Sequence, residues 1–346
     1  MTTSEPRLSS PRSRESSRLI AVLRRRSVRG ALGGWLAINA VLLALAGDKL
    51  PFHASSLTEP PASGEILQTN LMYLEIFALM GLVHLLTRRR QVPDLAGRAP
   101  GREVARRETA LVLGYAAIAM LGGCLLGHAF GWHAFGFHLD GMIIRTGQDV
   151  TPAETFCWAA YNLLAYAVVP YVVFRRRYTP EQLSLRSSNR RADLLLVVVV
   201  LVTESTVQLL LNPAVLQLGL RQFLLGVPLT VALSFAGTVL PTMILVYSIL
   251  TPRYLALTGS VPATLVLGGL TYALLHVFDG WTNFVSPTDA VISLLYVLLF
   301  YTGPGMFKTF LTIRTGNAST HVWAYHAIAP HALIDTPMFV KVFGIR

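Results

Sequence analysis

Long apolar runs separated by short arginine-rich segments dominate this sequence of 346 residues. Nine of them approach the roughly 20 residues that an α-helix needs to cross the hydrocarbon core of a bilayer. These runs cover residues 30–47, 66–86, 109–130, 155–174, 194–211, 223–250, 255–278, 290–301 and 322–343. The eighth run is short, and we expect neighbouring residues to extend it. Because helices satisfy their own backbone hydrogen bonds in lipid, the sequence predicts an all-α, polytopic transmembrane helical bundle of about nine spans.

Composition supports this class of protein and argues against a nucleic-acid-binding protein. Hydrophobic residues make up 53% of the chain and charged residues 14%, which is too apolar for an ordinary soluble domain. The formal net charge of +11 is concentrated in arginine triplets at 24–26, 88–90 and 175–177, each beside an end of an apolar run. We interpret this charge as a topology signal and expect no nucleic-acid partner.

The same basic residues predict the orientation of the chain. With nine spans and a cytoplasmic N-terminus, most of the 29 Lys and Arg residues fall in inner loops. We therefore expect an integral protein of a bacterial plasma membrane, with the lipid bilayer as its first partner.

A polar, basic segment suggests how the chain is divided. Residues 176–192 form a predicted cytoplasmic linker between a four-span region, 29–175, and a five-span region, 193–346. Residues 1–28 are rich in Ser, Arg and Pro, and they predict a disordered basic cytoplasmic tail.

Ionisable side chains inside the predicted spans are the candidates for function, because lipid makes such groups costly without a partner or a task. His331 and Asp335 lie four residues apart on one predicted helix face, so the carboxylate can orient the imidazole or join it as a metal ligand. Pro330 favours a bent segment beside a cavity. His326 shares the face of His331 only if the helix bends there. A structural hydrogen-bonded pair near the outer interface is the alternative.

Two further candidates come from earlier spans. His276 ends the run 255–278 and precedes Asp279, so it is either a site residue or an interfacial histidine bonded to its own loop. Glu204 is an isolated carboxylate that must be protonated or partnered, and it serves either a functional role or a polar helix-packing cluster. Glu75 is expected to be a packing or interfacial residue.

Three other histidines, His128, His133 and His138, recur at every fifth position. This spacing fits neither one face of a helix nor a known ligand motif, so the sequence disfavours a metal site there. The two cysteines, Cys124 and Cys157, lie in separate apolar runs and offer no thiolate zinc cluster.

Two short motifs occur in order within residues 192–340. They are Tyr272-x-x-x-His276, and Thr315-Gly316 followed by His331-x-x-x-Asp335. The motifs resemble Phe-x-x-x-His and His-x-x-x-Asn/Asp in the CPBP family, the CAAX-processing and bacteriocin-processing (Abi-like) intramembrane endopeptidases. The resemblance implies hydrolysis of a peptide bond at a membrane-embedded polar site.

The family's first motif, Glu-Glu-x-x-x-Arg, is not reproduced. Thr242 and Met243 occupy the glutamate positions, and Tyr247 occupies the arginine position. The family's glutamates are thought to activate the attacking water, which threonine and methionine cannot do at neutral pH. Either Glu204 supplies the carboxylate from a neighbouring span, or the chain is a non-proteolytic relative.

Three functions follow from these patterns. The first is an intramembrane endopeptidase with four catalytic residues, Glu204 as base, His276 and His331 beside a water, and Asp335 orienting His331. The second is a metalloenzyme acting on a lipid or isoprenoid, with a divalent metal held by His276, His326 and His331. The third is a non-catalytic relative that binds a lipid, a peptide or a partner protein. The first two imply a membrane-embedded peptide or lipid substrate.

Overall fold

The computed structural model of the chain describes residues 25–52, 61–139 and 150–346, and every regular element in these ranges is a helix. The first half contains α2 (Arg26–Leu45), α3 (Ala62–Thr87), α4 (Arg102–Ala129), α5 (Pro152–Asn162), η1 (Leu163–Val168) and α6 (Val169–Arg175). The second half begins with α7 (Arg190–Leu211), η2 (Pro213–Gln217), α8 (Leu220–Ser234), η3 (Phe235–Val239), α9 (Leu240–Thr242), η4 (Met243–Leu250) and α10 (Thr251–Thr258). It ends with α11 (Val261–Leu274), α12 (Pro287–Thr315), α13 (Ser319–His321), η5 (Val322–Asp335) and α14 (Thr336–Val342).

The predicted tail 1–28 lies outside the described residues except at its end, where α2 already begins at Arg26.

Seven helical stretches in the described ranges are long and apolar enough to cross a membrane. They are Arg26–Leu45, Ala62–Thr87, Arg102–Ala129, Pro152–Arg175, Arg190–Leu211, Leu220–Thr258 and Pro287–Thr315. The protein is therefore a multi-pass integral membrane protein. Helix α11 has 14 residues and is shorter than a span. The count of nine spans and the cytoplasmic N-terminus stay predictions.

The boundary between the predicted runs 223–250 and 255–278 differs from the observed one. Helical structure continues without interruption from Leu220 to Thr258, and the chain turns at Gly259, whose φ is +58°. The reason is Arg253, which is buried rather than exposed in a loop. Its Nε and Nη2 donate to Glu108 Oε2 at 2.9 and 2.7 Å. Because this ion pair satisfies the guanidinium, the helix passes through a residue that the sequence suggested would end it.

Glu108 joins α4 to a second polar group near the same end of the bundle. The Tyr178 hydroxyl donates to Glu108 Oε1 at 2.7 Å. Burial and the neighbouring carboxylate of Glu108 raise the pKa of Tyr178 above its usual value. The connection after α6 is thereby tied to α4 and α10.

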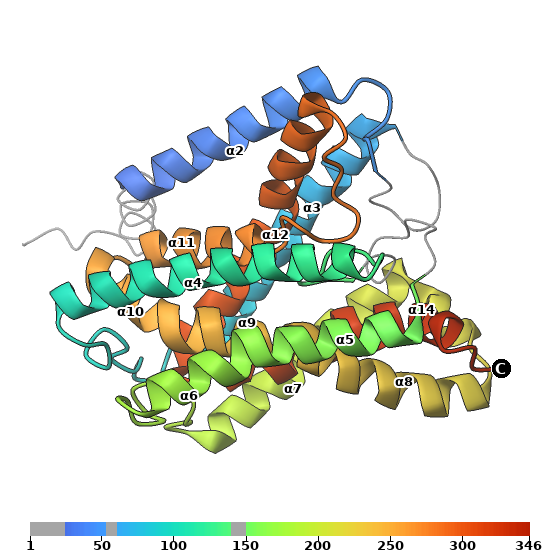
Figure 1. Cartoon of the computed structure of the whole chain (residues 1–346). Coiled ribbons are helices and arrows are strands. Elements are labelled where there is room, and N and C mark those ends of the chain that lie inside the picture. The colour runs from blue at the N-terminus through green and yellow to red at the C-terminus, as the bar shows by residue number, and fades with distance from the viewer. Residues whose placement is uncertain (1–24, 53–60, 140–149) are drawn as a thin grey trace, which may run out of the picture.

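Helices α11 and α12 pack most extensively against each other (Figure 1). The segment η5 packs against both α7 and α8. Glycines permit the close approach of α11 and α12: a Cβ on Gly269 would lie 2.6 Å from the carbonyl oxygen of Thr302, and one on Gly305 would lie 2.7 Å from the Tyr272 Cβ. Small residues at helix contacts are the usual means of close packing in membranes. The contact brings Tyr272 of α11 next to α12.

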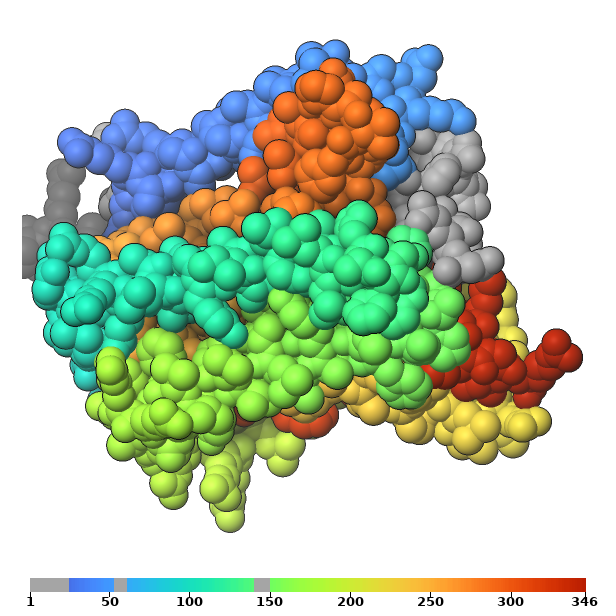
Figure 2. Space-filling model, viewed as in Figure 1, coloured from blue at the N-terminus to red at the C-terminus, as the bar shows by residue number. Residues whose placement is uncertain are grey.

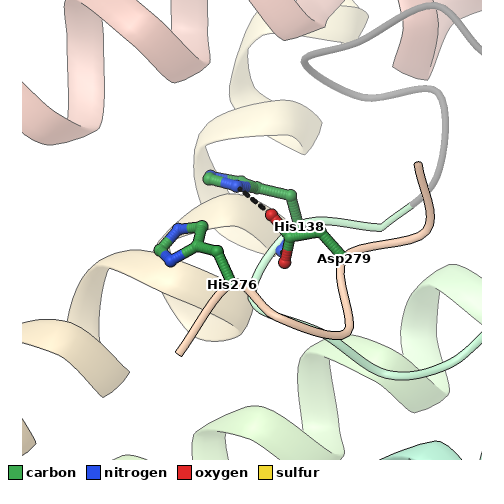
Figure 3. A group of neighbouring side chains, drawn as sticks. All are labelled: His138, His276 and Asp279. Atoms are coloured by element: carbon green, nitrogen blue, oxygen red, sulfur yellow. Dashed lines mark hydrogen bonds and ion pairs between the residues drawn. The ribbon is translucent and has the colours of Figure 1, made fainter. Parts of the chain in front are cut away.

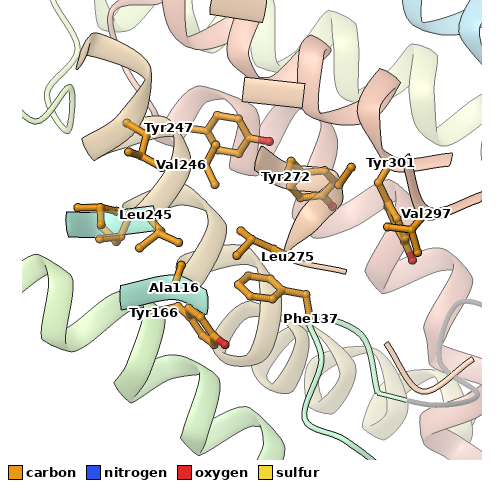
Figure 4. Close-up of a cluster of buried hydrophobic side chains, with 14 of the residues drawn as sticks. Ala116, Phe137, Tyr166, Leu245, Val246, Tyr247, Tyr272, Leu275, Val297 and Tyr301 are labelled. Carbon is orange, nitrogen blue, oxygen red and sulfur yellow. The ribbon is translucent and has the colours of Figure 1, made fainter. Parts of the chain in front are cut away.

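The largest hydrophobic core combines residues from both predicted regions (Figure 4). Ala116 of α4 and Tyr166 of η1 come from the four-span region, whereas Tyr247 of η4 and Tyr272 of α11 come from the five-span region. The two regions are therefore packed together around one core, and the polar cluster described below borders it.

Candidate metal centre

Five histidines gather at the buried border of this core. They are His138, His276, His321, His326 and His331, and none is more than 2% exposed. Their rings form a continuous series of contacts, with centroid separations of 4.7 Å between His276 and His138, 5.4 Å between His138 and His331, 5.0 Å between His331 and His326, and 5.8 Å between His326 and His321. Such a concentration of imidazoles inside an apolar bundle is a functional feature by default.

His138 reaches the cluster from the segment that follows α4. Gly136 makes this possible, since a Cβ there would lie 2.6 Å from the backbone nitrogen of Asp279. The Gly136 carbonyl accepts hydrogen bonds from Trp158 Nε1 and Asn162 Nδ2, each at 2.8 Å. The segment is thus fixed between α5 and the 275–286 connection.

His276 lies just beyond the end of α11, and Asp279 follows in the same connection. The His276 Nδ1 donates to the Tyr272 carbonyl oxygen at 2.8 Å, which leaves Nε2 to act as a ligand or proton acceptor. Tyr301 of α12 packs its ring 3.8 Å from the His276 ring. Its hydroxyl donates to Asp279 Oδ2 at 3.0 Å.

The compact part of the cluster is formed by His138, His276 and Asp279 (Figure 3). One ligand atom from each of the three lies within 4.8 Å of the other two. Two imidazoles on one tetrahedral zinc ion have ring centroids about 5 Å apart, given Zn–N bonds of about 2.1 Å. The observed separation of 4.7 Å between His138 and His276 is close to this value.

Unsatisfied atoms also point to a ligand at this cluster. Nε2 of His138, His276 and His331 is buried without a hydrogen-bond partner in the part of the chain that the structure describes. Buried polar atoms are normally hydrogen-bonded, so several orphans in one place call for an explanation. The donor set of imidazole nitrogen and carboxylate oxygen fits a divalent transition metal.

His331 and Asp335 form a separate pair beside this centre. The π-helical turns of η5 place them on one face, and the His331 Nδ1 donates to Asp335 Oδ2 at 2.7 Å. The carboxylate fixes the imidazole with Nε2 deprotonated, which is the state of a general base. This is the pairing expected from their spacing. Its ring contact with His138 joins the pair to the three-residue cluster.

His326 lies where three segments meet, which are the ones aligned with the three motifs of the CPBP family. Its Nδ1 is 3.4 Å from Thr242 Oγ1 of α9, and its Nε2 is 3.4 Å from the Tyr272 hydroxyl of α11. Tyr247 of η4 contacts His321 instead, with ring centroids 4.3 Å apart. The segments carrying Thr242, Tyr272 and His331 therefore converge.

Glu204 has different neighbours. Its Oε1 accepts a hydrogen bond from Gln208 Nε2 at 3.0 Å, and its carboxyl interacts with Glu75 and with Lys308. Its expected role as the base beside His276 and His331 stays a prediction.

Sequence reasoning missed two members of the compact cluster, His138 and Asp279. His138 carried no usable signal, because it was assigned to a series with His128 and His133, which lie elsewhere. His128 bonds to the Cys124 carbonyl oxygen of its own helix, and His133 bonds to Glu154. Asp279 did carry a local signal, three residues after His276.

A cavity of about 330 Å³ opens between α4 and α6, and its lining includes Leu111, Tyr115, Val169, Phe174 and Leu245. None of the five histidines lines it. Side chains of α4 and of α5 to α6 cover much of this face of the molecule (Figure 2). The cavity is apolar and is not the candidate site.

Comparison with protein-family models, with curated proteins and with solved structures gave no match. The fold and the site therefore define the class of this protein. It is a multi-pass helical membrane protein with a buried cluster of histidines and carboxylates.

Proposed function

We propose that this protein is a metal-dependent hydrolase whose centre lies inside the membrane-embedded bundle. The observation that carries the proposal is the meeting of His138, His276 and Asp279 within 4.8 Å in a buried place. Two histidines and one carboxylate are a known ligand set of zinc hydrolases, in which a fourth position takes water or substrate. This set shares His276 with the ligands expected from sequence and replaces His326 and His331 with His138 and Asp279.

The residues around the ligands have distinct roles in this proposal. A divalent cation held by the three ligands would lower the pKa of a bound water to about 7. His331 accepts at Nε2 the proton that the attacking water loses, and Asp335 stabilises the resulting imidazolium through the 2.7 Å hydrogen bond. The Tyr272 carbonyl orients His276, and Tyr301 holds the Asp279 carboxylate.

The substrate class follows from the surroundings of the centre. The centre is buried among apolar helices, and this environment favours a membrane-embedded peptide or lipid as the substrate. Convergence of the segments with Thr242, Tyr272 and His331 supports a CPBP-like arrangement, and for this reason we place peptide-bond hydrolysis first. In that arrangement the metal takes over water activation, which Thr242 and Met243 cannot perform.

Metal content tests the proposal. Detergent-purified protein is incubated with Zn²⁺, desalted and analysed for metal and protein. We expect one zinc ion per chain in the wild type, and a loss of at least tenfold in affinity in His276→Ala and Asp279→Asn. The matched control is His128→Ala, which removes a histidine that bonds only within its own helix and should leave the zinc content unchanged.

Catalysis is tested with the same set of proteins. Zinc-loaded wild type and His331→Ala are compared for hydrolysis of membrane-embedded peptides and of lipids in proteoliposomes. Turnover that requires zinc and falls at least a hundredfold in His331→Ala supports the hydrolase. Zinc binding with equal turnover in both proteins contradicts the role given to His331, and a wild type that retains no zinc contradicts the metal centre.

A further inference from the structure

A second polar cluster is formed by Glu75, Glu204 and Lys308, beside Tyr325. The proposed hydrolase does not use it. Glu204 of α7 is 1% exposed, and its carboxyl interacts directly with that of Glu75 near the middle of α3. The Glu204 Oε2 and Glu75 Oε1 atoms are both buried, and neither receives a hydrogen bond from the described residues. Two acceptor oxygens thus remain unsatisfied where two carboxyls meet.

Other charged and titratable groups face this carboxyl pair. Lys308 of α12 is 1% exposed and attracts Glu204 electrostatically. Its Nζ lies 3.8 Å from the Tyr272 ring centroid and 5.7 Å from that of Tyr325 on η5. The cluster therefore contains one cationic group and two acidic groups, with tyrosines around the ammonium.

The charge balance of this cluster decides how many protons it holds. With both carboxyls ionised, two like charges would meet in a low-dielectric interior and leave one net negative charge beside Lys308. One proton between the carboxyls removes the repulsion and donates a hydrogen bond where none is otherwise available. It also leaves a single negative charge to balance the ammonium of Lys308.

We propose that Glu75 and Glu204 share one proton and form a proton-binding site inside the membrane-embedded bundle. The shared proton keeps the Glu75–Glu204–Lys308 cluster neutral. Since Lys308 lies over the ring of Tyr272, whose carbonyl holds His276, the site adjoins the histidine cluster. The proposal needs no metal at that cluster, so the two proposals succeed or fail separately.

Infrared spectroscopy tests this site through the carbonyl stretching band of a protonated carboxyl. Wild type and variants are reconstituted in lipid vesicles, and difference spectra against wild type are recorded. We expect Glu75→Gln and Glu204→Gln each to remove the band completely, although each variant retains one carboxyl. The reason is that the remaining carboxylate alone balances Lys308.

Replacing the cation gives the opposite result. In Lys308→Met both carboxyls are expected to be protonated, and the band area should rise about twofold. The matched control is Glu154→Gln. Glu154 Oε1 already accepts hydrogen bonds from the backbone nitrogen and Nδ1 of His133, at 2.8 and 2.7 Å, and its replacement should change nothing in this region.

Three results would overturn the proposal. One is a band that disappears in only one of the two glutamine variants, since the proton would then belong to a single carboxyl. Another is a wild-type spectrum that all variants reproduce. The third is a band seen only without sodium, which would make the pair a sodium site. Circular dichroism verifies folding, and Glu75→Gln provides a variant at the less buried position if Glu204→Gln does not fold.

Discussion

His138 and Asp279 are 141 positions apart in the chain and are joined by two hydrogen bonds. The backbone nitrogen of His138 donates to Asp279 Oδ1 at 2.9 Å, and its Nδ1 lies 3.1 Å from Oδ2. Both residues are buried. This double contact connects the segment after α4 to the connection after α11, and it assembles the candidate centre from both predicted regions of the chain.

Replacing Asp279 with Asn is expected to weaken both folding and metal binding. The change removes the charge that accepts from His138 and Tyr301, and hydrogen bonds to charged groups contribute about 1.5 to 3 kcal/mol each. We expect the free energy of unfolding to fall by about 2 to 3 kcal/mol, measured by denaturant titration in detergent. Asp289→Asn, in the first turn of α12, is the control and should cost less than about 1 kcal/mol. Equal losses in both variants would argue against a special role for Asp279.

Gly136→Ala is expected to separate the two loops that build the centre. A Cβ at this position would lie 2.6 Å from the Asp279 nitrogen, so the backbone must shift, at a cost of about 1 to 3 kcal/mol. Zinc affinity should fall with stability. Gly114→Ala on α4 is the matched control, since its Cβ would meet nothing within 4 Å. Full zinc affinity in Gly136→Ala would show that the loop contact does not position His138.

Glu108→Gln is expected to be among the most destabilising conservative changes in the chain. It breaks a buried ion pair and leaves the Arg253 guanidinium uncompensated, which typically costs about 3 to 5 kcal/mol. Glu103→Gln is the control, because its pair with Arg106 is exposed and contributes about 0 to 1 kcal/mol. The measurement compares the loss of unfolding free energy in Glu108→Gln with the loss in Glu103→Gln. Similar values would mean that α10 does not depend on the buried pair.

The membrane class of this protein could be predicted from sequence because apolar runs of spanning length depend on local composition alone. The His331–Asp335 pair could be predicted for a similar reason, since helical spacing fixes it. The end of the stretch Leu220–Thr258 could not, because the carboxylate that neutralises Arg253 lies 145 residues away on α4. When the partner of a charged residue cannot be identified from the sequence, that residue predicts an exposed loop.

The candidate site shows the same division between local and distant information. His276 and His331 are candidates from sequence because ionisable side chains inside predicted spans are costly without a partner or a task. Glu204 is isolated in its own span, and only the structure shows that its carboxyl interacts with that of Glu75 on another helix. His138 required knowledge of the contact with Asp279, which no local spacing encodes.

X-ray absorption spectroscopy of the zinc-loaded protein tests the central claim most directly, because it reports the atoms bound to the ion. The proposal predicts a shell of nitrogen and oxygen at about 2.0 to 2.2 Å, with the multiple scattering of two imidazoles. In His276→Ala the signal should correspond to one imidazole or disappear with the metal. A wild-type spectrum without imidazole scattering, or one that His276→Ala leaves unchanged, would contradict the centre at His138, His276 and Asp279.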